Sequence, residues 1–527
     1  MLLSHTRMPN EVLQHIAQCL QDGKAMHAFL SALPDAWLTP PMVALATLYK
    51  AVRSDQLADT NMTWLWPELD MRNLASIPGE FAPAFHAYAT MLPRLQADLK
   101  FHRHVSLPRD TPVARKCIVS TKELATALND WAQQLQSLGL TQDPDALPTQ
   151  HLCNALPRLP KLRHLDVLWQ ADAHAEETTV LLHALSDYSN VTELWLRYDS
   201  NSSSPQWTAT EVTALVRWLQ ANSVTAVGLV DVPIGDANAK VLARALLQSQ
   251  TLKSLHVDDG QLPRTLFSLG LSLPTQLESL NTYVRHIHDV LGLTQTIAGS
   301  NLRTLVVGTV VPLEWDAMLA TNLMNAITSL PRLRHLFLDH TALPLPSVVR
   351  LSERLPSLTT LRLYDTNLDD AGAAVLARAL PSCRHLETLG LIKENCTYVA
   401  AELLAKNIPY CPSLKTLNLD GSPIGSRGLV ALLPVVRCLD TLSLPGCGID
   451  DGGAAALCRV MDSTDHLYKL DLSCNLLSKV AVKRIIRALS KRATRWGAVY
   501  LCDIIQDEGE LDECMWKYLR NESWCYV

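Results

Sequence analysis

The sequence lacks a hydrophobic run long enough to cross a bilayer, which takes about 18–20 apolar residues. The longest uncharged run near the N-terminus, 37–49, has 13 residues and contains Pro40 and Pro41. The first twenty residues include Arg7 and Glu11 and no apolar stretch that ends in small residues, so a secretory signal is not expected. We therefore expect a cytoplasmic protein, with the nucleus as a second compartment, that binds no membrane.

The sequence also lacks the short motifs of common enzymes. It has no phosphate-binding G-x-x-x-x-G-K-(S/T), no G-x-S-x-G around a nucleophilic serine and no H-E-x-x-H zinc motif. Its 13 cysteines are scattered singly without a C-x-x-C pair, which is typical of reduced structural thiols. We predict that the chain is not an enzyme and has no catalytic residues, no cofactor and no metal site.

A strong excess of charge of either sign is missing as well. The 527 residues include 46 basic and 52 acidic side chains, which gives a formal net charge of −6. Nucleic-acid-binding domains usually carry a basic patch or stripe, and no large basic field is present here. We expect no nucleic-acid partner and a monomeric protein.

What the sequence does contain is a repeated eleven-residue phrase. Its clear copies are LRHLFLDHTAL at 333–343, LTTLRLYDTNL at 358–368, LKTLNLDGSPI at 414–424, LDTLSLPGCGI at 439–449 and LYKLDLSCNLL at 467–477. They fit L-x-x-L-x-L-x-x-(N/C/T/S)-x-(L/I), the signature of leucine-rich repeats. Weaker copies begin at Leu135, Leu162, Val191, Val224, Leu252, Leu277, Leu302, Leu386 and Trp496. This register predicts about fourteen repeats over 135–505, far more than the roughly three needed for stability.

The segments between these phrases have the pattern of helices. Three of them share a second phrase, which begins at Asp236, Asp370 and Asp451, where an aspartate can cap the free N–H groups of a helix. A unit of strand, turn and long helix resembles the ribonuclease-inhibitor-like class of leucine-rich repeats. That resemblance implies an α/β solenoid shaped as a horseshoe, with parallel strands on the concave face and helices on the convex face.

The resemblance is imperfect at the ninth repeat position, whose side chain bonds neighbouring backbone turns in this family. The clear copies have Thr341, Thr366, Ser422, Cys447 and Asn475 there, all of which are small or polar. Other copies have Val232, Arg285, Val310 or Glu394, and we expect that these four cannot all play the same role.

The N-terminus has a different pattern. Met8 and Pro9 precede an apolar stripe of Leu13, Ile16 and Leu20, spaced as on one face of a helix. The segment resembles the first helix of an F-box, which implies that these five residues bind a Skp-type subunit of a ubiquitin ligase. The later part of the F-box pattern is absent. The alternative is a helical cap that covers the open end of the solenoid, since terminal repeats need such caps.

These patterns divide the chain into four parts. We predict an F-box-like helical region at 1–50, a connecting region at 51–134 that could hold degenerate first repeats, leucine-rich repeats at 135–505 and a C-terminal cap at 506–527. We expect the connecting region to join the N-terminal helices to the solenoid without a flexible linker.

The repeat geometry also predicts a binding face. The leucines of L-x-x-L-x-L enter the core, so positions 3, 5 and 7 point outward from the concave sheet, and position 8 lies at its edge. Exposed aromatic side chains on such a face are typical of protein interfaces. The predicted partner-binding residues are Asp166, Trp169, Trp195, Arg197, Tyr198, Asp258, Tyr283, Phe337, Asp339, Arg362 and Tyr364. The alternative is that the aromatic side chains only pack on one another along the strands.

Two functions fit these features. The first is an F-box/leucine-rich-repeat adaptor, which recruits a protein target on its concave face to a cullin-type ubiquitin ligase. The second is a stand-alone leucine-rich-repeat interaction or inhibitor protein with no ligase partner.

Overall fold

A computed structural model of the chain gives two compact units, residues 1–245 and 246–527, which we call unit 1 and unit 2. The structure describes residues 23–53, 68–70, 81–89, 94–96, 113–115, 132–142, 149–169, 175–188, 190–198, 206–258, 260–309, 317–461, 467, 469–490, 498–501 and 524–526.

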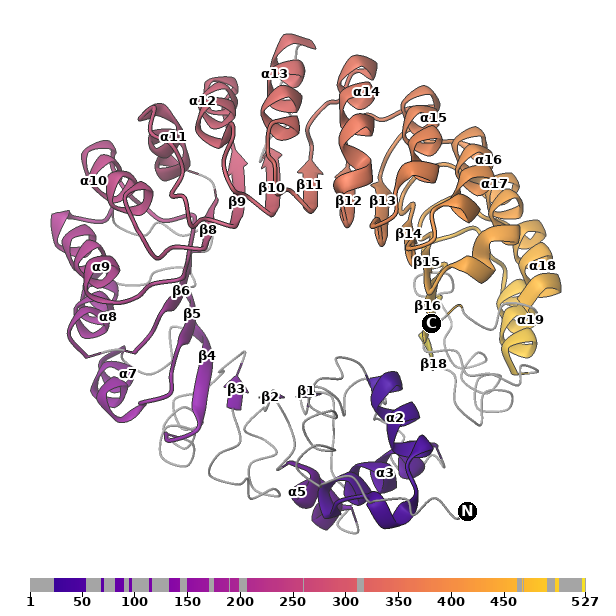
Figure 1. Cartoon of the computed structure of the whole chain (residues 1–527), viewed down its shortest axis with the longest axis horizontal. Coiled ribbons are helices and arrows are strands. Elements are labelled where there is room, and N and C mark those ends of the chain that lie inside the picture. Colours follow the sequence, from indigo (N-terminus) through magenta and orange to yellow (C-terminus); the bar gives the residue numbers. More distant parts are fainter. Residues whose placement is uncertain are drawn as a thin grey trace, which may run out of the picture. The chain divides into compact units, whose positions relative to one another are not determined.

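Unit 1 begins with helices and continues as a parallel sheet with helices on one side (Figure 1). Among its N-terminal helices, α3 (Pro40–Arg53) and α5 (Ala82–Ala89) pack on each other, and Leu45 and Phe85 are fully buried there. Each strand pairs in parallel with the next along the chain. The strands are β1 (Glu68–Asp70), β2 (Arg94–Gln96), β3 (Val113–Arg115), β4 (Leu135–Gln142), β5 (His164–Trp169), β6 (Glu193–Tyr198) and β7 (Ala226–Val230). The helices are α2 (Gly23–Ala32), α3 (Pro40–Arg53), α5 (Ala82–Ala89), α7 (Thr149–Ala155), α8 (Ala175–Tyr188), α9 (Ala209–Ala221) and α10 (Asp236–Leu247).

Unit 2 repeats one strand and one helix along most of its length. Its strands lie on the inner side of an arc and its helices on the outer side (Figure 1). The strands, each parallel to the next, are β8 (Ser254–Asp258), β9 (Ser279–Val284), β10 (Thr304–Thr309), β11 (His335–Asp339), β12 (Thr360–Tyr364), β13 (Thr388–Ile392), β14 (Thr416–Asn418), β15 (Thr441–Ser443), β16 (Lys469–Asp471), β17 (Ala498–Tyr500) and β18 (Trp524–Tyr526). The helices are α11 (Gln261–Ser268), α12 (Ile287–Ile297), α13 (Ala317–Thr328), α14 (Leu345–Arg354), α15 (Asp370–Ala379), α16 (Tyr398–Asn407), α17 (Gly425–Leu432), α18 (Asp451–Val460) and α19 (Lys479–Ser490).

The core of each repeat lies between its strand and its helix. In the repeat that begins at Leu414, the side chains of Leu414, Leu417 and Leu419 are 2 %, 0 % and 0 % exposed. Thr416 and Asn418 alternate with them and are partly exposed, as the two-residue period of a strand requires. The structure confirms the predicted fold class, an α/β leucine-rich-repeat solenoid with parallel strands on the concave side, helices on the convex side and a helical N-terminal region.

Parallel strands also occur on both sides of the predicted repeat region, 135–505. Strands β1, β2 and β3 lie within the predicted connecting region, 51–134, and β18 lies within the predicted cap, 506–527. The proposed division into four parts stays a prediction, but in each unit parallel strands occur outside the repeats that the sequence predicted.

The aspartates that begin two of the outer helices act differently from our expectation. Asp369, not Asp370, caps α15, and its side chain accepts the Gly372 N–H. The Asp370 carboxylate accepts the amide (2.8 Å) and the hydroxyl (2.6 Å) of Thr397, which caps the helix of the following repeat. Asp451 likewise accepts the amide of Ser478 (2.7 Å), just before α19. These aspartates therefore join neighbouring repeats along the convex side.

Candidate functional site

The concave face of each unit presents the outward positions of its strands. Strands β5, β6, β8, β9 and β11 alternate partly exposed and buried residues along their whole length. The predicted residues found on these faces are Asp166, Trp195, Arg197, Asp258, Tyr283, Phe337, Asp339, Arg362 and Tyr364. Arg362 is exposed, and the other eight are partly exposed.

Two predicted binding residues are wrong, because Trp169 and Tyr198 point into the core. Trp169 is 1 % exposed and Tyr198 is 5 % exposed, and their rings stack with centroids 6.2 Å apart. The Tyr198 hydroxyl bonds to Thr178 Oγ1 (2.8 Å) and accepts the Trp207 Nε1–H (3.0 Å). Burial raises the pKa of Tyr198 to about 12. These two residues pack on each other in the core and offer little surface to a partner.

Trp169 and Tyr198 were misplaced because the backbone conformation at repeat position 8 differs between repeats. Where the strand extends to this position, the alternation continues and the side chain turns inward, as it does for Trp169, Tyr198, Val284 and Thr309. In other repeats the residue at position 8 is left-handed and lies outside the strand. These left-handed residues are Asp231, His340, Asp365, Lys393, Gly421, Gly446 and Cys474. Aromatic and β-branched residues favour the first arrangement, and Asp or Gly favour the second, so the residue type at position 8 carried the missing signal.

In unit 1 the candidate face centres on Trp195. A Cβ atom on Gly228, its partner in the next strand, would lie 2.3 Å from Trp195 Cδ1, so the indole occupies the space that a side chain would fill. Arg197 donates to both carboxylate oxygens of Asp166, at 3.0 Å from Nε and 2.6 Å from Nη2. His164 lies against the indole with ring centroids 5.0 Å apart. The result is a large apolar ring on a rigid strand, beside a fixed pair of opposite charges.

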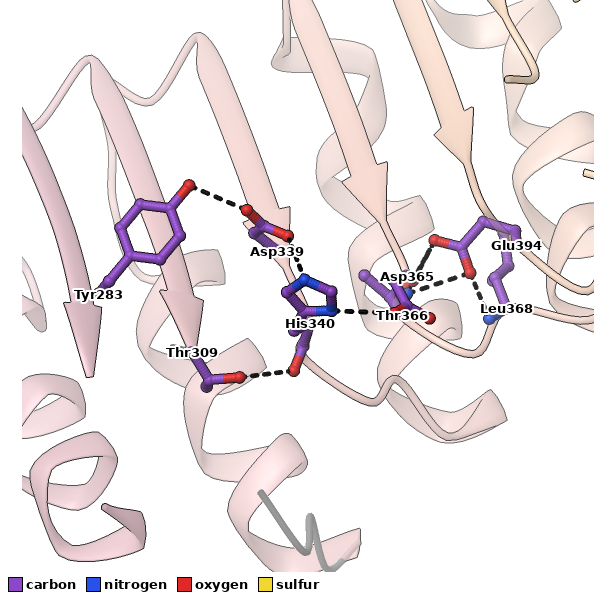
Figure 2. Close-up of polar contacts among 8 residues, drawn as sticks. All are labelled: Tyr283, Thr309, Asp339, His340, Asp365, Thr366, Leu368 and Glu394. Carbon is purple, nitrogen blue, oxygen red and sulfur yellow. Dashed lines mark hydrogen bonds and ion pairs between the residues drawn. The ribbon is translucent and has the colours of Figure 1, made fainter. Parts of the chain in front are cut away.

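In unit 2 the candidate face centres on Tyr283. Gly308 of β10 pairs with Tyr283 on one side and with Asp339 on the other. A Cβ on Gly308 would lie 2.3 Å from Tyr283 Cε1, so the ring crosses β10 above this glycine. Its hydroxyl donates to Asp339 Oδ2 at 2.9 Å, two strands away (Figure 2). The missing side chain at Gly308 therefore allows a hydrogen bond to span two interstrand spacings, about 9–10 Å.

The polar contacts of Asp339 continue to the next repeat through His340. His340 Nε2 lies 3.6 Å from Asp339 Oδ1, and its Nδ1 lies 2.9 Å from Asp365 Oδ2 (Figure 2). The His340 ring also meets Tyr364 edge-on at 5.3 Å, and Lys393 Nζ lies 4.9 Å from the centre of the Tyr364 ring. Two carboxylates, one imidazole and two phenol rings are thus held in fixed positions along one rim of the sheet.

Below this rim, Glu394 at the ninth repeat position bonds the neighbouring turn, so one of the four atypical residues does play the family's role. Its side chain accepts the Leu368 N–H at 2.8 Å, and the Thr366 N–H and hydroxyl at 3.0 and 2.8 Å (Figure 2). Asn475 does the same in its own repeat, where its Oδ1 accepts the N–H groups of Cys447 and Ile449, each at 3.0 Å. A glutamate can therefore replace the usual short polar residue, because its longer side chain still places two acceptor oxygens at the turn.

Sequence reasoning missed Gly228, Gly308 and Lys393. The glycines have no side chain to suggest a role in the sequence. Their role, to leave space for Trp195 and Tyr283, follows only from the strand register that sets them beside these residues. With the register known, a glycine opposite a large outward residue would have been a usable signal. Arg362 follows the same pattern, since its Cγ would lie 3.3 Å from a Cβ on Gly390.

The F-box-like residues Met8, Pro9, Leu13, Ile16 and Leu20 lie outside the described part of the chain. Within the described part, no group of three histidine, cysteine or carboxylate side chains could hold a metal ion. No helix there is long and apolar enough to cross a membrane.

Comparison with known proteins agrees on the repeats. The family described as Leucine Rich repeat matches residues 410–433 and 437–458. No curated protein matches the sequence. Among solved structures, the yeast Rad7 and Elc1 complex has a similar chain at 12 % identity and a TM-score of 0.35, covering 95 % of this chain and 90 % of that one. An internalin of Listeria monocytogenes is similar at 15 % identity and a TM-score of 0.32, covering 67 % of this chain and 83 % of that one.

Proposed function

We propose that this chain is a non-catalytic scaffold that binds a protein partner on the concave faces of its leucine-rich repeats. The observation that carries the proposal is the seating of Trp195 and Tyr283 above glycines. Large rings held on a rigid sheet face lose little conformational freedom on binding, and aromatic residues dominate the energetics of protein interfaces.

A finer proposal concerns the N-terminus. The resemblance of 8–20 to the first helix of an F-box supports a role as a substrate-recruiting adaptor of a cullin-type ubiquitin ligase, in the cytoplasm or nucleus. In this role a Skp-type subunit binds Met8, Pro9, Leu13, Ile16 and Leu20, and the concave face holds the target. The competing proposal is a stand-alone interaction or inhibitor protein that uses the same concave face without a ligase partner.

The concave face is tested by substitution of its rings. Trp195→Ala in unit 1 and Tyr364→Ala in unit 2, alone and together, remove aromatic contacts while the strand leucines remain in place. We expect a folded double variant that fails to capture partners from cross-linked cell extract, because each lost anchor typically costs 2 kcal/mol or more, about thirtyfold in affinity. Met318→Ala on α13, whose side chain is 68 % exposed on the convex side, is the matched control. Undiminished capture by the double variant would place the binding site elsewhere.

Co-purification separates the two finer proposals. The adaptor proposal requires that the full chain, co-expressed with a Skp-type subunit, forms a complex of fixed stoichiometry on gel filtration. A full chain that elutes alone would leave the stand-alone scaffold.

A further inference from the structure

One row of the unit 2 concave face alternates carboxylates and aromatic rings. Repeat position 7 of five successive strands, β8 to β12, is occupied by Asp258, Tyr283, Gly308, Asp339 and Tyr364. The backbone register pairs each of these residues with the next, and we call the five the position-7 row. A carboxylate therefore flanks the Tyr283 ring on each side, Asp258 in the neighbouring strand and Asp339 across Gly308.

The Tyr283 ring is fixed before any ligand arrives. It lies over Gly308, and its hydroxyl is anchored on Asp339 Oδ2 at 2.9 Å. The side chain is partly exposed on the concave face. The negative π-face of such a ring attracts cations.

The carboxylates of Asp258 and Asp339 both act on the pKa of the Tyr283 hydroxyl. Burial raises the pKa of the Tyr283 hydroxyl, and the hydrogen bond and charge of Asp339 and the charge of Asp258 raise it further. Three polar atoms of this area, His256 Nε2, Asn281 Oδ1 and Asp339 Oδ1, have no hydrogen-bond partner among the described residues. Unpaired buried polar atoms are costly, and two of the three, Asn281 Oδ1 and Asp339 Oδ1, are acceptors, so a ligand that supplies donors to them would gain binding energy.

The basic side chains nearby are directed elsewhere. Arg362 leans over Gly390 toward β13, and Lys393 lies over the Tyr364 ring at 4.9 Å. In the described part of the chain, the basic groups within ion-pair distance of Asp258 and Asp339 are the imidazoles of His256 (3.9 Å) and His340 (3.6 Å). Lys393 illustrates that a ring of this row accepts a cation, while Tyr283 and its two carboxylates hold no lysine or arginine in that part.

Resting on the proposed function, we propose that the position-7 row binds an arginine side chain in a basic segment of the partner protein. A guanidinium is planar and can stack on the Tyr283 ring. It also carries five N–H donors that can reach carboxylate oxygens on either side, whereas a lysine ammonium lacks the flat shape. The negative charges of Asp258 and Asp339 complement a basic segment and would speed its approach.

The test uses the full chain and three labelled peptides of nine residues, (Gly-Ser-Arg)3, (Gly-Ser-Lys)3 and (Gly-Ser-Glu)3, with binding followed by fluorescence anisotropy at low and moderate salt. We expect the arginine peptide to bind most tightly and the glutamate peptide least. Joint replacement of Asp258→Asn and Asp339→Asn should weaken arginine-peptide binding by about tenfold or more. Tyr283→Leu should weaken it while leaving the carboxylates in place, and Tyr283→Phe, which keeps the ring, should retain most of it.

Glu402→Gln on α16 is the matched control, because it removes one exposed carboxylate from the convex side, where it pairs with Arg427 at 3.0 Å. Equal losses for this control and the double variant would show diffuse charge attraction and overturn the proposal. No binding of the arginine peptide up to about 1 mM, or no preference over the glutamate peptide, would also overturn it. If the arginine peptide fails these tests but the partner is still lost in the Trp195→Ala variant, whose residue lies outside the position-7 row, the arginine site alone fails and the concave scaffold stands.

Discussion

At the scale of single residues, Glu394 is an ionisable group placed where repeats usually have a short polar side chain. It is 2 % exposed, and its carboxylate accepts N–H groups of Thr366 and Leu368. Burial raises the pKa of Glu394, while these hydrogen bonds oppose the shift. Because the folded pKa lies above the unfolded one, the folded protein holds its proton to a higher pH than the unfolded chain does. The contribution of Glu394 to stability is therefore complete below the unfolded pKa and falls as the pH rises through the folded pKa.

The raised pKa of Glu394 leads to a prediction for the pH dependence of the Glu394→Gln variant. The glutamine NH2 would face an N–H donor, so we expect a loss of about 1–3 kcal/mol in the free energy of unfolding. The difference in unfolding free energy between the natural protein and the variant should narrow as the pH rises from about 4.5, since the stability that Glu394 loses in this window is absent from the variant at every pH. Urea unfolding of both proteins at several pH values measures it. A difference that widens with pH would mean that the hydrogen bonds outweigh burial and that the pKa of Glu394 is lowered.

Inward and outward residues of one strand should differ sharply in their tolerance of charge. Leu417 is fully buried and Thr416 beside it is partly exposed on the concave side. Leu417→Asp buries an unpaired carboxylate, and we expect it to cost more than about 4 kcal/mol or to prevent folding. Thr416→Asp should cost under about 1 kcal/mol. Thermal melts of the two variants compare them directly, and equal losses would contradict the register of β14.

At the scale of the strand, the sequence predicted the register of the repeats well and the ends of the strands poorly. The leucine spacing alone places Leu414, Leu417 and Leu419 in the core, because burial of apolar side chains dominates the strand interior. The end of a strand depends on a local backbone choice at position 8, which the leucine pattern does not contain. Trp169 was misplaced for this reason, while His340, at the same repeat position, turns out of the sheet with φ of 50°.

The candidate site, too, could be predicted from the sequence only in part. The aromatic and charged residues of the concave face could be predicted from repeat positions 3, 5 and 7. Their arrangement could not, since the Tyr283–Asp339 hydrogen bond depends on the glycine between them and spans 56 residues of sequence. Contacts between strands depend on the register in which neighbouring strands pair. The sequence of a single repeat does not encode that register.

Trp169 and Trp195 offer a test of strand-end geometry with one residue type. Trp169 is 1 % exposed, and Trp195 is partly exposed on the concave face of the same unit. Trp169→Ala leaves a cavity in the core and should cost about 3–5 kcal/mol. Trp195→Ala should leave the melting temperature within a few degrees and instead weaken partner capture. Differential scanning fluorimetry and the capture assay together measure both effects. If Trp195→Ala lowered the melting temperature more than Trp169→Ala does, the assignment of Trp169 to the core and of Trp195 to the concave surface would be reversed.

At the scale of the whole molecule, the two proposals give the N-terminal segment different roles. An array of repeats exposes the core leucines of its first repeat unless a cap covers them. An F-box-like element would instead keep part of its apolar stripe available to a ligase subunit. The same residues, Leu13, Ile16 and Leu20, thus have opposite surroundings in the two proposals.

Deletion of residues 1–36 separates these proposals, because it removes the stripe together with α2. If the segment is an adaptor element, the truncated protein stays monomeric and loses the Skp-type subunit, and its melting temperature falls because the buried Met26 and Leu30 of α2 are also removed. If it is a cap, the truncated protein aggregates, since uncovered apolar surface costs about 25 cal/mol per Å². Light scattering, melting temperature and co-purification read out the two outcomes. Ile16→Asp in the full chain is the matched variant, because it places a charge on the stripe and keeps α2. An adaptor then loses the ligase subunit while remaining soluble, whereas a cap variant is destabilised whether or not the subunit is present.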